Sequence, residues 1–291
     1  MVIIKVMGGL GNQLYQYALY EQFVQRGKDV YLDFSWYCEG GNRPMELDYF
    51  PNIKYRECSS EQRECLIKKK RNIIDLLCGK RCGLVHQPLM YSENIYSLDE
   101  VYLDGYWGEV EYWMPVIDIL KQRLNFPASS DERNIWALEK IKETNAVSLH
   151  IRRGDYLDEK LKKIFGGICT EDYYVAALNY VKEKIKDIHL FVFSDDSEYI
   201  RSRFVGEDIT IVDWNTNENS IYDMMLMSYC KVNICANSTF SKWAAILNKN
   251  SNCLRIIPLR HNKTQQVEPD TVLKQLAGWT VIDEQGNIYE R

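Results

Sequence analysis

The sequence lacks long apolar runs, a basic excess and a leader segment. No apolar stretch reaches the length of about 18 residues that a transmembrane helix needs, so none is expected. The start, 1–7, has no basic region, so we interpret it as a strand rather than a signal peptide. Acidic residues number 41 and basic residues 36, a net charge of −5, which gives no electrostatic case for a nucleic-acid partner.

Sequence patterns for metal binding are also scarce. The nine cysteines are odd in number, form no C-x-x-C pair and have no matching histidine spacing. We therefore expect reduced thiols in a cytoplasmic protein and no structural zinc site. No D-x-D occurs, so the carboxylate pair that usually holds a divalent metal on a nucleotide diphosphate is missing, and we expect no metal site.

The 291 residues suit one or two domains, and a hydrophobic content of 46% supports a real core. Apolar strand patterns alternate with helical patterns, most regularly after residue 144. Such alternation predicts parallel sheets with helices on both faces. The stretch 125–131, rich in Pro and Ser, is the best linker candidate, so we predict an N-terminal α/β domain over 1–130 and a Rossmann-like domain over 131–291.

The central feature is an apolar strand over 147–151 that runs directly into Arg152 and Arg153. Ligands of open α/β sheets bind outside the carboxyl ends of strands. Two guanidinium groups there suit a phosphate, whose oxygens match their fixed fork of donors. The competing interpretation is a surface arginine pair that forms salt bridges with Asp155 and contributes little.

Two further strand ends carry polar groups, namely 194–196 (Ser-Asp-Asp) and 237–239 (Asn-Ser-Thr). The second also begins a helix, whose backbone N–H groups and hydroxyls can hold phosphate oxygens, although an ordinary Ser/Thr cap has the same sequence. With the arginine pair, these ends predict a diphosphate site. Asp223, on a helix over 220–227, suits the two donors of a guanine, or is simply a surface carboxylate.

The N-terminal half begins with a strand, a glycine-rich turn over 8–12 and a helix predicted over 13–25. A nicotinamide-binding fingerprint is disfavoured, because counted from Gly9 the sixth position of G-x-G-x-x-G is Leu14. A second helix is predicted over 61–77, with the basic run 68–71 inside it. That run is either a solvated face or a contact with an anionic membrane surface.

Three motifs in order resemble the bacterial α-1,2-fucosyltransferases of glycosyltransferase family 11. They are Gly8-Gly9-Leu10-Gly11-Asn12-Gln13-Leu14-Tyr15, His150-x-Arg152-Arg153-x-Asp155-Tyr156 and Ala236-Asn237-Ser238-Thr239-Phe240-Ser241-x-Trp243. A Gly-Tyr-Trp at 105–107 also looks like the family's Gly-Tyr-aromatic segment. The resemblance spans residues 8–247. The H-x-R-R-x-D element is shared with α-1,6- and protein O-fucosyltransferases, so it indicates GDP-fucose more firmly than the linkage.

The resemblance implies a GT-B-like fold of two facing Rossmann-like domains with parallel sheets, the donor-binding domain being C-terminal. It further implies transfer of L-fucose from GDP-β-L-fucose, with inversion, to the 2-OH of a terminal β-galactoside, without metal or cofactor. The acceptor would be a galactose-terminated glycan, possibly lipid-linked, in surface polysaccharide or O-antigen synthesis. The enzyme would be cytoplasmic, possibly peripheral at the inner face of the plasma membrane; its oligomeric state stays open.

By the same resemblance, Arg152 and Arg153 hold the diphosphate and are catalytic together with Asp155. The other expected donor-binding residues are Gly9, Gly11, Asn12, His150, Ser194, Asp223, Asn237, Ser238, Thr239 and Phe240. An inverting displacement calls for a carboxylate base, for which Asp155, Asp158 and Glu159 are the nearby choices. The alternative role for Asp155 is to orient the arginines without acting as the base. Two other functions compete: a GDP-fucose transferase of another linkage such as α-1,6, and a non-catalytic GDP-sugar-binding protein.

Overall fold

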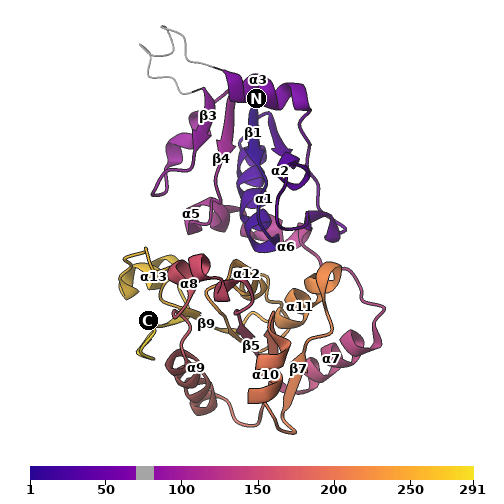
Figure 1. The fold of residues 1–291 in the computed structure, drawn as a ribbon, viewed down its shortest axis with the longest axis vertical. Helices are drawn as coiled ribbons and strands as arrows, with labels where there is room; N and C mark the ends of the chain where they lie inside the picture. Colours follow the sequence, from indigo (N-terminus) through magenta and orange to yellow (C-terminus); the bar gives the residue numbers. More distant parts are fainter. Residues whose placement is uncertain (70–81) are drawn as a thin grey trace. The chain divides into compact units, whose positions relative to one another are not determined.

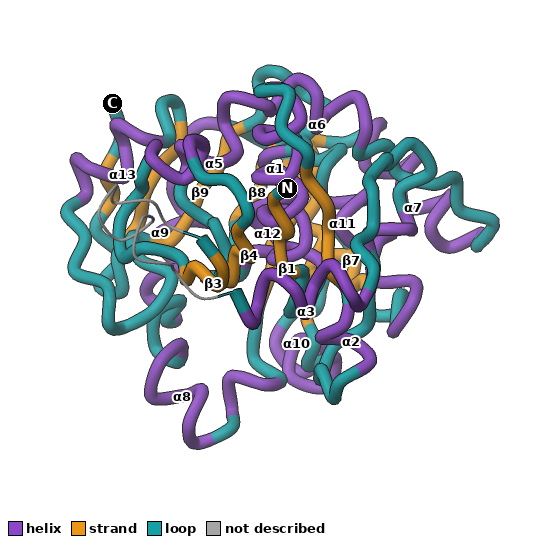
Figure 2. Tube along the Cα trace, turned by 90° about the horizontal axis from the view of Figure 1, so that it is seen from above, coloured by secondary structure: helices purple, strands orange, loops and turns teal. Residues whose placement is uncertain are grey.

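The computed structural model describes residues 1–69 and 82–291. The described chain divides into two compact units, Met1–Pro127 and Ala128–Arg291, called here the N-terminal and the C-terminal unit (Figure 1). The division falls inside the predicted linker 125–131, a little before the predicted boundary at residue 130. Helices and strands alternate along the trace of both units (Figure 2).

The N-terminal unit is built on a four-stranded sheet of order β2-β1-β4-β3, in which every neighbouring pair is parallel. Its described elements are β1 (Val2–Lys5), α1 (Leu10–Gln25), β2 (Val30–Asp33), α2 (Ser35–Cys38), α3 (Ser60–Lys68), β3 (Gly83–His86), β4 (Val101–Asp104), α5 (Val110–Trp113) and α6 (Ile117–Arg123), with short 3-10 turns at Leu47–Tyr49, Glu93–Ser97 and Met114–Val116.

The C-terminal unit carries a seven-stranded sheet of order β11-β10-β9-β8-β5-β6-β7, parallel except for the β10–β11 pair. Its elements are α7 (Glu132–Glu143), β5 (Asn145–Ile151), α8 (Glu159–Phe165), α9 (Glu171–Lys184), β6 (Ile188–Ser194), α10 (Ser197–Arg203), β7 (Ile209–Val212), α11 (Ser220–Met227), β8 (Val232–Ile234), α12 (Thr239–Ile246), β9 (Leu254–Pro258), α13 (Pro269–Gln275), β10 (Trp279–Ile282) and β11 (Ile288–Tyr289), with 3-10 turns at Asp155–Leu157 and Asn217–Asn219.

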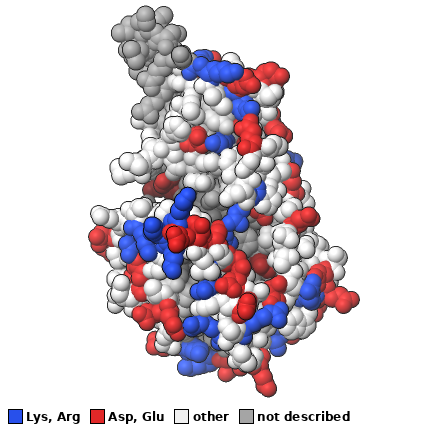
Figure 3. All heavy atoms as spheres, viewed as in Figure 1, with Lys and Arg blue, Asp and Glu red and all other residues white. Residues whose placement is uncertain are grey.

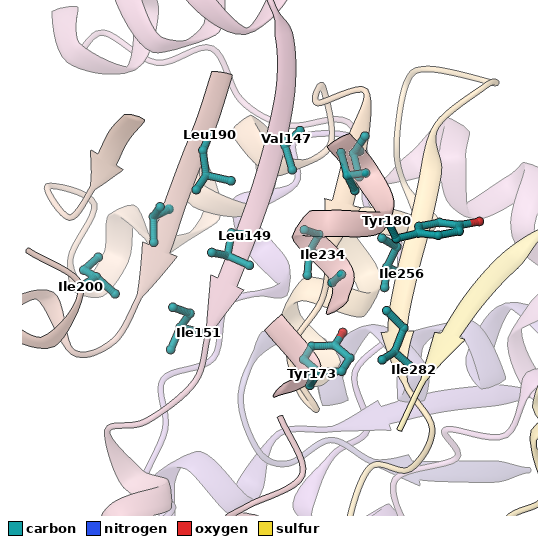
Figure 4. Close-up of a cluster of buried hydrophobic side chains, with 14 residues drawn as sticks. Val147, Leu149, Ile151, Tyr173, Tyr180, Leu190, Ile200, Ile234, Ile256 and Ile282 are labelled. Atoms are coloured by element: carbon teal, nitrogen blue, oxygen red, sulfur yellow. The ribbon is translucent and has the colours of Figure 1, made fainter. Parts of the chain in front are cut away.

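One face of the C-terminal sheet forms an apolar core (Figure 4). Val147, Leu149 and Ile151 alternate along β5 and point to this face, where side chains of the neighbouring strands join them. Tyr173 and Tyr180 of α9 and residues of α10 cover the cluster. Burial of these side chains, at about 25 cal/mol per Å² of apolar area, stabilises the unit.

The opposite face of β5 is buried too, although it carries polar side chains. Ser148 and His150 are 2% and 5% exposed. The Ser148 hydroxyl accepts from the Asn233 amide at 2.7 Å, and the same amide donates to the Met227 carbonyl at 2.8 Å. The alternation in the sequence therefore separates an apolar face from a hydrogen-bonded face, rather than a buried face from a solvated one.

Helix α1 begins at Leu10, three residues before the predicted start at Gln13. It is buried almost throughout. Two of its buried glutamines form hydrogen bonds with backbone groups of the surrounding loops. Gln13 donates to the carbonyls of Gly8 and Pro44 at 3.0 and 2.9 Å. Gln16 accepts from the amide of Met7 at 3.0 Å. Polar residues on the inner side of a helix weaken its apolar periodicity. The start was therefore placed after the glycine-rich stretch 8–12, although the helix begins inside it.

The remaining predictions about strands, the basic run and membrane helices have separate outcomes. The strands β3, β10 and β11 were not predicted, whereas a strand expected over 253–258 is confirmed as β9. In the basic run 68–71, Lys68 pairs with Glu64 at 2.6 Å and Lys69 with Glu100 at 2.7 Å, while 70–71 and the rest of the predicted helix lie outside the described residues. Within the described ranges, no helix is both long and apolar enough to cross a bilayer.

Candidate functional site

The strand order of the C-terminal sheet places its binding crevice. Counted along the chain, β5 is the first strand of the sheet, β6 and β7 follow on one side, and β8, β9 and β10 on the other. This is the 3-2-1-4-5-6 order of doubly wound nucleotide-binding sheets, whose ligands bind where the direction of winding reverses. The reversal lies between the carboxyl ends of β5 and β8, so Arg152 and Asn237 follow the two strands that flank it.

Arg152 is held by two carboxylates at the end of β5. Its Nε and Nη2 donate to the two oxygens of Asp155 at 3.0 and 2.9 Å, a bidentate pair. Its Nε also lies 3.1 Å from Asp195 Oδ2. The side chain is 21% exposed, so the guanidinium is fixed but still reachable. The competing interpretation, a salt bridge with Asp155, is therefore correct for this contact, yet the pair is not a loose surface pair.

Arg153 is fixed in a different way. Its Nε donates to Asp196 at 3.0 Å, and its guanidinium carbon lies 3.7 Å from the centroid of the Tyr199 ring. Hydrogen bonding from the Tyr199 amide, followed by contact with Arg153, lowers the pKa of Asp196 and keeps it charged. A guanidinium has five N–H donors, so one held through Nε keeps further donors for an anion.

Asp195 holds the turn that follows β5 and carries the two arginines. One of its oxygens accepts from the amides of Arg153 and Gly154 at 2.8 and 3.0 Å. A side chain at Gly154 would collide with this carboxylate, since an added Cβ would lie 2.7 Å from Asp195 Oδ2. Asp195 and Asp196 were noted as a strand end, but were not chosen as site residues. The missed signal was two carboxylates directly after an apolar strand, opposite two arginines.

Ser194, which was chosen, is the last residue of β6. Its hydroxyl accepts from the Asp196 amide at 3.0 Å, so it helps to set the turn that carries the two carboxylates.

His150 is buried beside the arginine pair. Its ring lies 6.0 Å from the Phe240 ring, and its Nδ1 has no hydrogen-bond partner among the described residues. Burial, and then the neighbouring charge of Arg152, lower its pKa to about 4, so the imidazole is neutral at pH 7. A buried polar atom without a partner is costly in a folded protein and marks a place where a ligand could supply one.

The turn after β8 brings its four predicted residues to the crevice with different roles. Asn237 donates through its amide to the carbonyls of Phe165 and His261 at 3.0 and 3.1 Å, and its own carbonyl accepts from Tyr156 at 2.9 Å. Its amide thus ties three loops together rather than offering N–H groups to a donor. Ser238 caps α12, accepting from the Phe240 amide at 3.3 Å.

Thr239 and Phe240 open the first turn of α12 and are partly exposed, as residues facing a ligand must be. Backbone N–H groups of a first helical turn suit a phosphate.

Asp223 lies on α11 in a polar network. It accepts from Asn215 at 2.8 Å, and Asn215 exchanges two further hydrogen bonds of 2.8 Å with Asn134 on α7. Burial, and secondarily the charge of Asp213, raise the pKa of Asp223 to about 8. The carboxyl is therefore not an ordinary surface group, and its partner Asn215 lies in the segment after β7.

The remaining predicted residues belong to the N-terminal unit, in the turn after β1. Gly9 is the N-cap of α1 and Asn12 lies in its first turn, both partly exposed. Gly11 is also in the helix, but it is buried, so the expected backbone approach at this residue is not available from the surface. Gly8 has a φ of 81°, a conformation that only glycine adopts readily.

Of the thirteen residues chosen from the sequence, ten lie in the C-terminal unit and three in the N-terminal unit. No group of three or more potential metal ligands occurs within residues 1–69 and 82–291.

Comparison with known proteins assigns the family. The profile described as Glycosyl transferase family 11 matches residues 92–283. The chain belongs to glycosyltransferase family 11. Among relatives, an alpha-1,2-colitosyltransferase of Escherichia coli is 32% identical over 281 residues, covering 89% of this chain and 91% of the relative. The O-antigen biosynthesis glycosyltransferase WbnK of Escherichia coli is 30% identical over 285 residues, covering 86% of this chain and 91% of that protein.

Solved structures support the fold of this family member. The crystal structure of NodZ alpha-1,6-fucosyltransferase co-crystallized with GDP has a TM-score of 0.50 and 12% sequence identity, and the match covers 99% of this chain and 97% of that one. At this identity the likeness shows the fold alone. The predicted GT-B class, with two α/β units and parallel sheets, is confirmed. The chain is thus a glycosyltransferase, as predicted.

Proposed function

We propose that the protein is an inverting glycosyltransferase that transfers L-fucose from GDP-β-L-fucose to the 2-OH of a terminal β-galactoside. Arg152 and Arg153, placed at the reversal point of the C-terminal sheet and fixed by three carboxylates, carry the proposal. A diphosphate leaving group gains negative charge as its bond to the sugar breaks. Guanidinium groups already oriented toward it stabilise that charge without reorganisation.

The transfer step follows from this placement. The acceptor 2-OH oxygen bonds to C1 of fucose while the bond from C1 to the β-phosphate oxygen breaks, so GDP leaves and the configuration inverts. The hydroxyl proton passes to a base. Asp155 engages both oxygens with Arg152, which favours an orienting role for it, whereas Asp158 caps α8 by accepting from the Lys160 amide at 2.9 Å. A transition state with oxocarbenium character needs only weak base assistance.

Two residues of the C-terminal unit, Asp223 and His150, are candidate partners for the nucleoside end of the donor. Asp223 can accept from the N1–H and the exocyclic amine of guanine once its carboxyl, with a pKa of about 8, has lost its proton, and His150 presents the buried Nδ1 without a described partner. Ser238, Thr239 and Phe240 supply the helix start for the phosphates. The GDP in the NodZ structure is consistent with such a donor.

The linkage and the biological role rest on relatives. One is named for an alpha-1,2 linkage and another for O-antigen biosynthesis, and each aligns over most of this chain. We therefore assign the reaction to surface polysaccharide or O-antigen assembly, with a galactose-terminated acceptor. A metal-free mechanism, a cytoplasmic location and peripheral membrane contact remain predictions from the sequence.

One relative favours a second candidate donor. The 32% identical alpha-1,2-colitosyltransferase uses, by its name, a different deoxysugar. A colitosyl donor would meet the same arginine pair, because the diphosphate is common to both donors. The two candidates differ only in the sugar subsite, so a donor panel separates them.

The test is a transfer screen by mass spectrometry in EDTA. Purified protein is incubated with GDP-fucose, GDP-colitose or GDP-mannose and a set of β-galactosides. We expect a product heavier by one fucose, and no product when the acceptor galactose carries a 2-O-methyl group. Transfer to the 2-O-methylated acceptor would point to another linkage. Binding of GDP-fucose without transfer to any acceptor would point to a binding protein.

Metal dependence is read from the same screen. Activity that disappears in EDTA and returns with Mg²⁺ or Mn²⁺ would contradict the metal-free mechanism.

A further inference from the structure

The turn after β4 in the N-terminal unit holds a backbone conformation that side chains seldom adopt. Trp107 has a φ of 58°, in the left-handed region. The residue is fully buried, and its ring packs edge-on against Tyr112 with centroids 5.4 Å apart. Such conformations persist only where the surroundings determine them, and they cluster at ligand-binding sites.

Two glutamine side chains impose this turn. Gln87, just after β3, accepts through Oε1 from the amides of Tyr106 and Trp107 at 2.7 and 2.9 Å. Its Nε2 is in turn held by the two oxygens of Glu109 at 2.9 and 2.8 Å. From the other side, Gln16 of α1 donates to the Gly105 carbonyl at 3.0 Å. The turn is thus fixed at three consecutive residues.

The constrained turn presents one aromatic ring to solvent. Tyr106 is 50% exposed, whereas Trp107, Tyr112 and Trp113 are between 0% and 1% exposed. Packing does not account for this ring, because it is the member of the segment that lies outside the core. The same hydrogen bonds thus hold the buried Trp107 in the core and set the backbone position from which the Tyr106 ring projects.

The ring stands at the carboxyl edge of the N-terminal sheet, the edge at which α/β sheets bind ligands. Its phenol lies close to that of Tyr37, whose pKa is raised first by burial and then by Glu46 and Tyr106. Tyr37 donates to the Gly8 carbonyl at 3.0 Å. Beside it, a side chain added at Gly9 would meet no atom within 4 Å, so the neighbouring turn borders open space.

We propose that Tyr106 is an acceptor-binding residue whose ring stacks on a pyranose of the sugar acceptor, with Gln87 as its positioning residue. The inference deepens the proposed function and rests on it. An aromatic ring offers a flat apolar face that matches the C–H face of a pyranose, and its phenol can bond to a sugar hydroxyl. Fixing the backbone that carries the ring removes part of the ordering cost of binding.

The test measures acceptor and donor separately in the variants Tyr106→Ala, Tyr106→Phe and Gln87→Met. Tyr106→Ala should raise the acceptor KM about tenfold, the upper range of a ring-stacking contact, while the affinity for GDP stays within about twofold of wild type. Tyr106→Phe should keep most of the affinity, and Gln87→Met should raise the acceptor KM with little change in kcat. Trp136→Ala, which removes another aromatic that is 50% exposed, is the matched control.

A second readout does not depend on transfer. Saturation-transfer NMR with methyl β-galactoside, recorded in the presence of GDP, should show sugar binding to the wild type and its loss in Tyr106→Ala. If sugar binds in this way but no donor is transferred, the proposed function fails while the assignment of Tyr106 stands. Galactoside binding or an acceptor KM equal in Tyr106→Ala and Trp136→Ala would overturn the assignment, and so would no galactoside binding to the wild type.

Discussion

At the scale of single residues, the structure shows a positioning role for Asp195 that the sequence did not indicate. It accepts from two successive backbone amides and pairs with Arg152, so it positions both arginines without being one of the predicted donor ligands. The sequence places it at a strand end, but cannot say which carboxylate contacts which arginine. That choice depends on the register of β5 against β6, where Ile151 lies opposite Ser194.

Asp195→Asn tests this positioning role. The amide nitrogen would face the Arg152 guanidinium, donor against donor, and a hydrogen bond to a charged group contributes roughly 1.5–3 kcal/mol. We expect kcat/KM for transfer to fall about 10- to 100-fold and the free energy of unfolding to fall by no more than about 3 kcal/mol, measured by kinetics and urea unfolding. Asp270→Asn, which alters an exposed pair with Arg291, is the control and should leave transfer unchanged. Equal activity of the two variants would argue against the role of Asp195.

Asp223 gives the chain a dependence of stability on pH. Its folded-state pKa of about 8 exceeds the ordinary value of 3.8, so the folded state binds this proton more tightly than the unfolded state. The contribution to the free energy of unfolding is therefore complete below pH 3.8 and is lost as the pH rises through about 8.

Asp223→Asn should remove that dependence, because an amide does not titrate. In urea unfolding at several pH values between 5 and 9, the stability of the wild type relative to Asp223→Asn should fall with rising pH, by at most about 1.4 kcal/mol per unit. Parallel curves for the two proteins would show that the burial of this carboxyl does not perturb it.

At the scale of elements, strand β5 shows both the success and the limit of sequence reasoning. Its alternation identified the strand and the arginines that follow it. The alternation did not show that both polar side chains of the strand are buried, Ser148 in a hydrogen bond with Asn233 and His150 beside the arginine pair. Partners of this kind lie far along the chain, as Asn233 does, and a local pattern carries no information about them.

Helix α1 and the turn after β8 differ from expectation for a related reason. Buried amides there take the place of apolar side chains, and the residues that they bind are distant in sequence, as with Gln13 and Pro44. Asn237 looked like a donor ligand because it precedes a helix start, yet its amide joins the loops at Phe165 and His261.

Asn237→Ala should therefore act through stability. It leaves two partly buried carbonyls without their amide donor, a loss of roughly 1–3 kcal/mol in the free energy of unfolding. Urea unfolding measures the effect. Asn125→Ala is the control, because that exposed amide donates only to the nearby Gln122 carbonyl at 2.6 Å. A loss of activity with unchanged stability would instead return Asn237 to the list of direct donor ligands.

At the scale of the whole molecule, the alternation of strands and helices and the Pro- and Ser-rich stretch predicted two α/β units. The division after Pro127 falls in the stretch that Pro and Ser marked. Acidic and basic side chains are interspersed on the face of the C-terminal unit shown in Figure 3, in keeping with a net charge of −5. Charge alone therefore gives no binding site, and the site emerged only from the order of the strands.

Hydrogen exchange locates the nucleotide within the molecule. Added GDP should slow amide exchange in the C-terminal unit, at 150–158 and 236–241, because these segments follow the two strands that flank the reversal point. Exchange at the ends of β10 and β11 serves as the internal control and should not change. Protection confined to residues 1–69 would place the nucleotide in the other unit.

The most direct test of the central claim is a calorimetric titration of GDP in EDTA into the wild type and Arg153→Ala. We predict binding to the wild type and an affinity about 100-fold lower in Arg153→Ala, because a charge-assisted contact to a phosphate is lost. Arg291→Ala, which removes an exposed arginine paired with Asp270, should bind GDP like the wild type. Equal GDP affinity in all three proteins would contradict the assignment of the arginine pair as the diphosphate site.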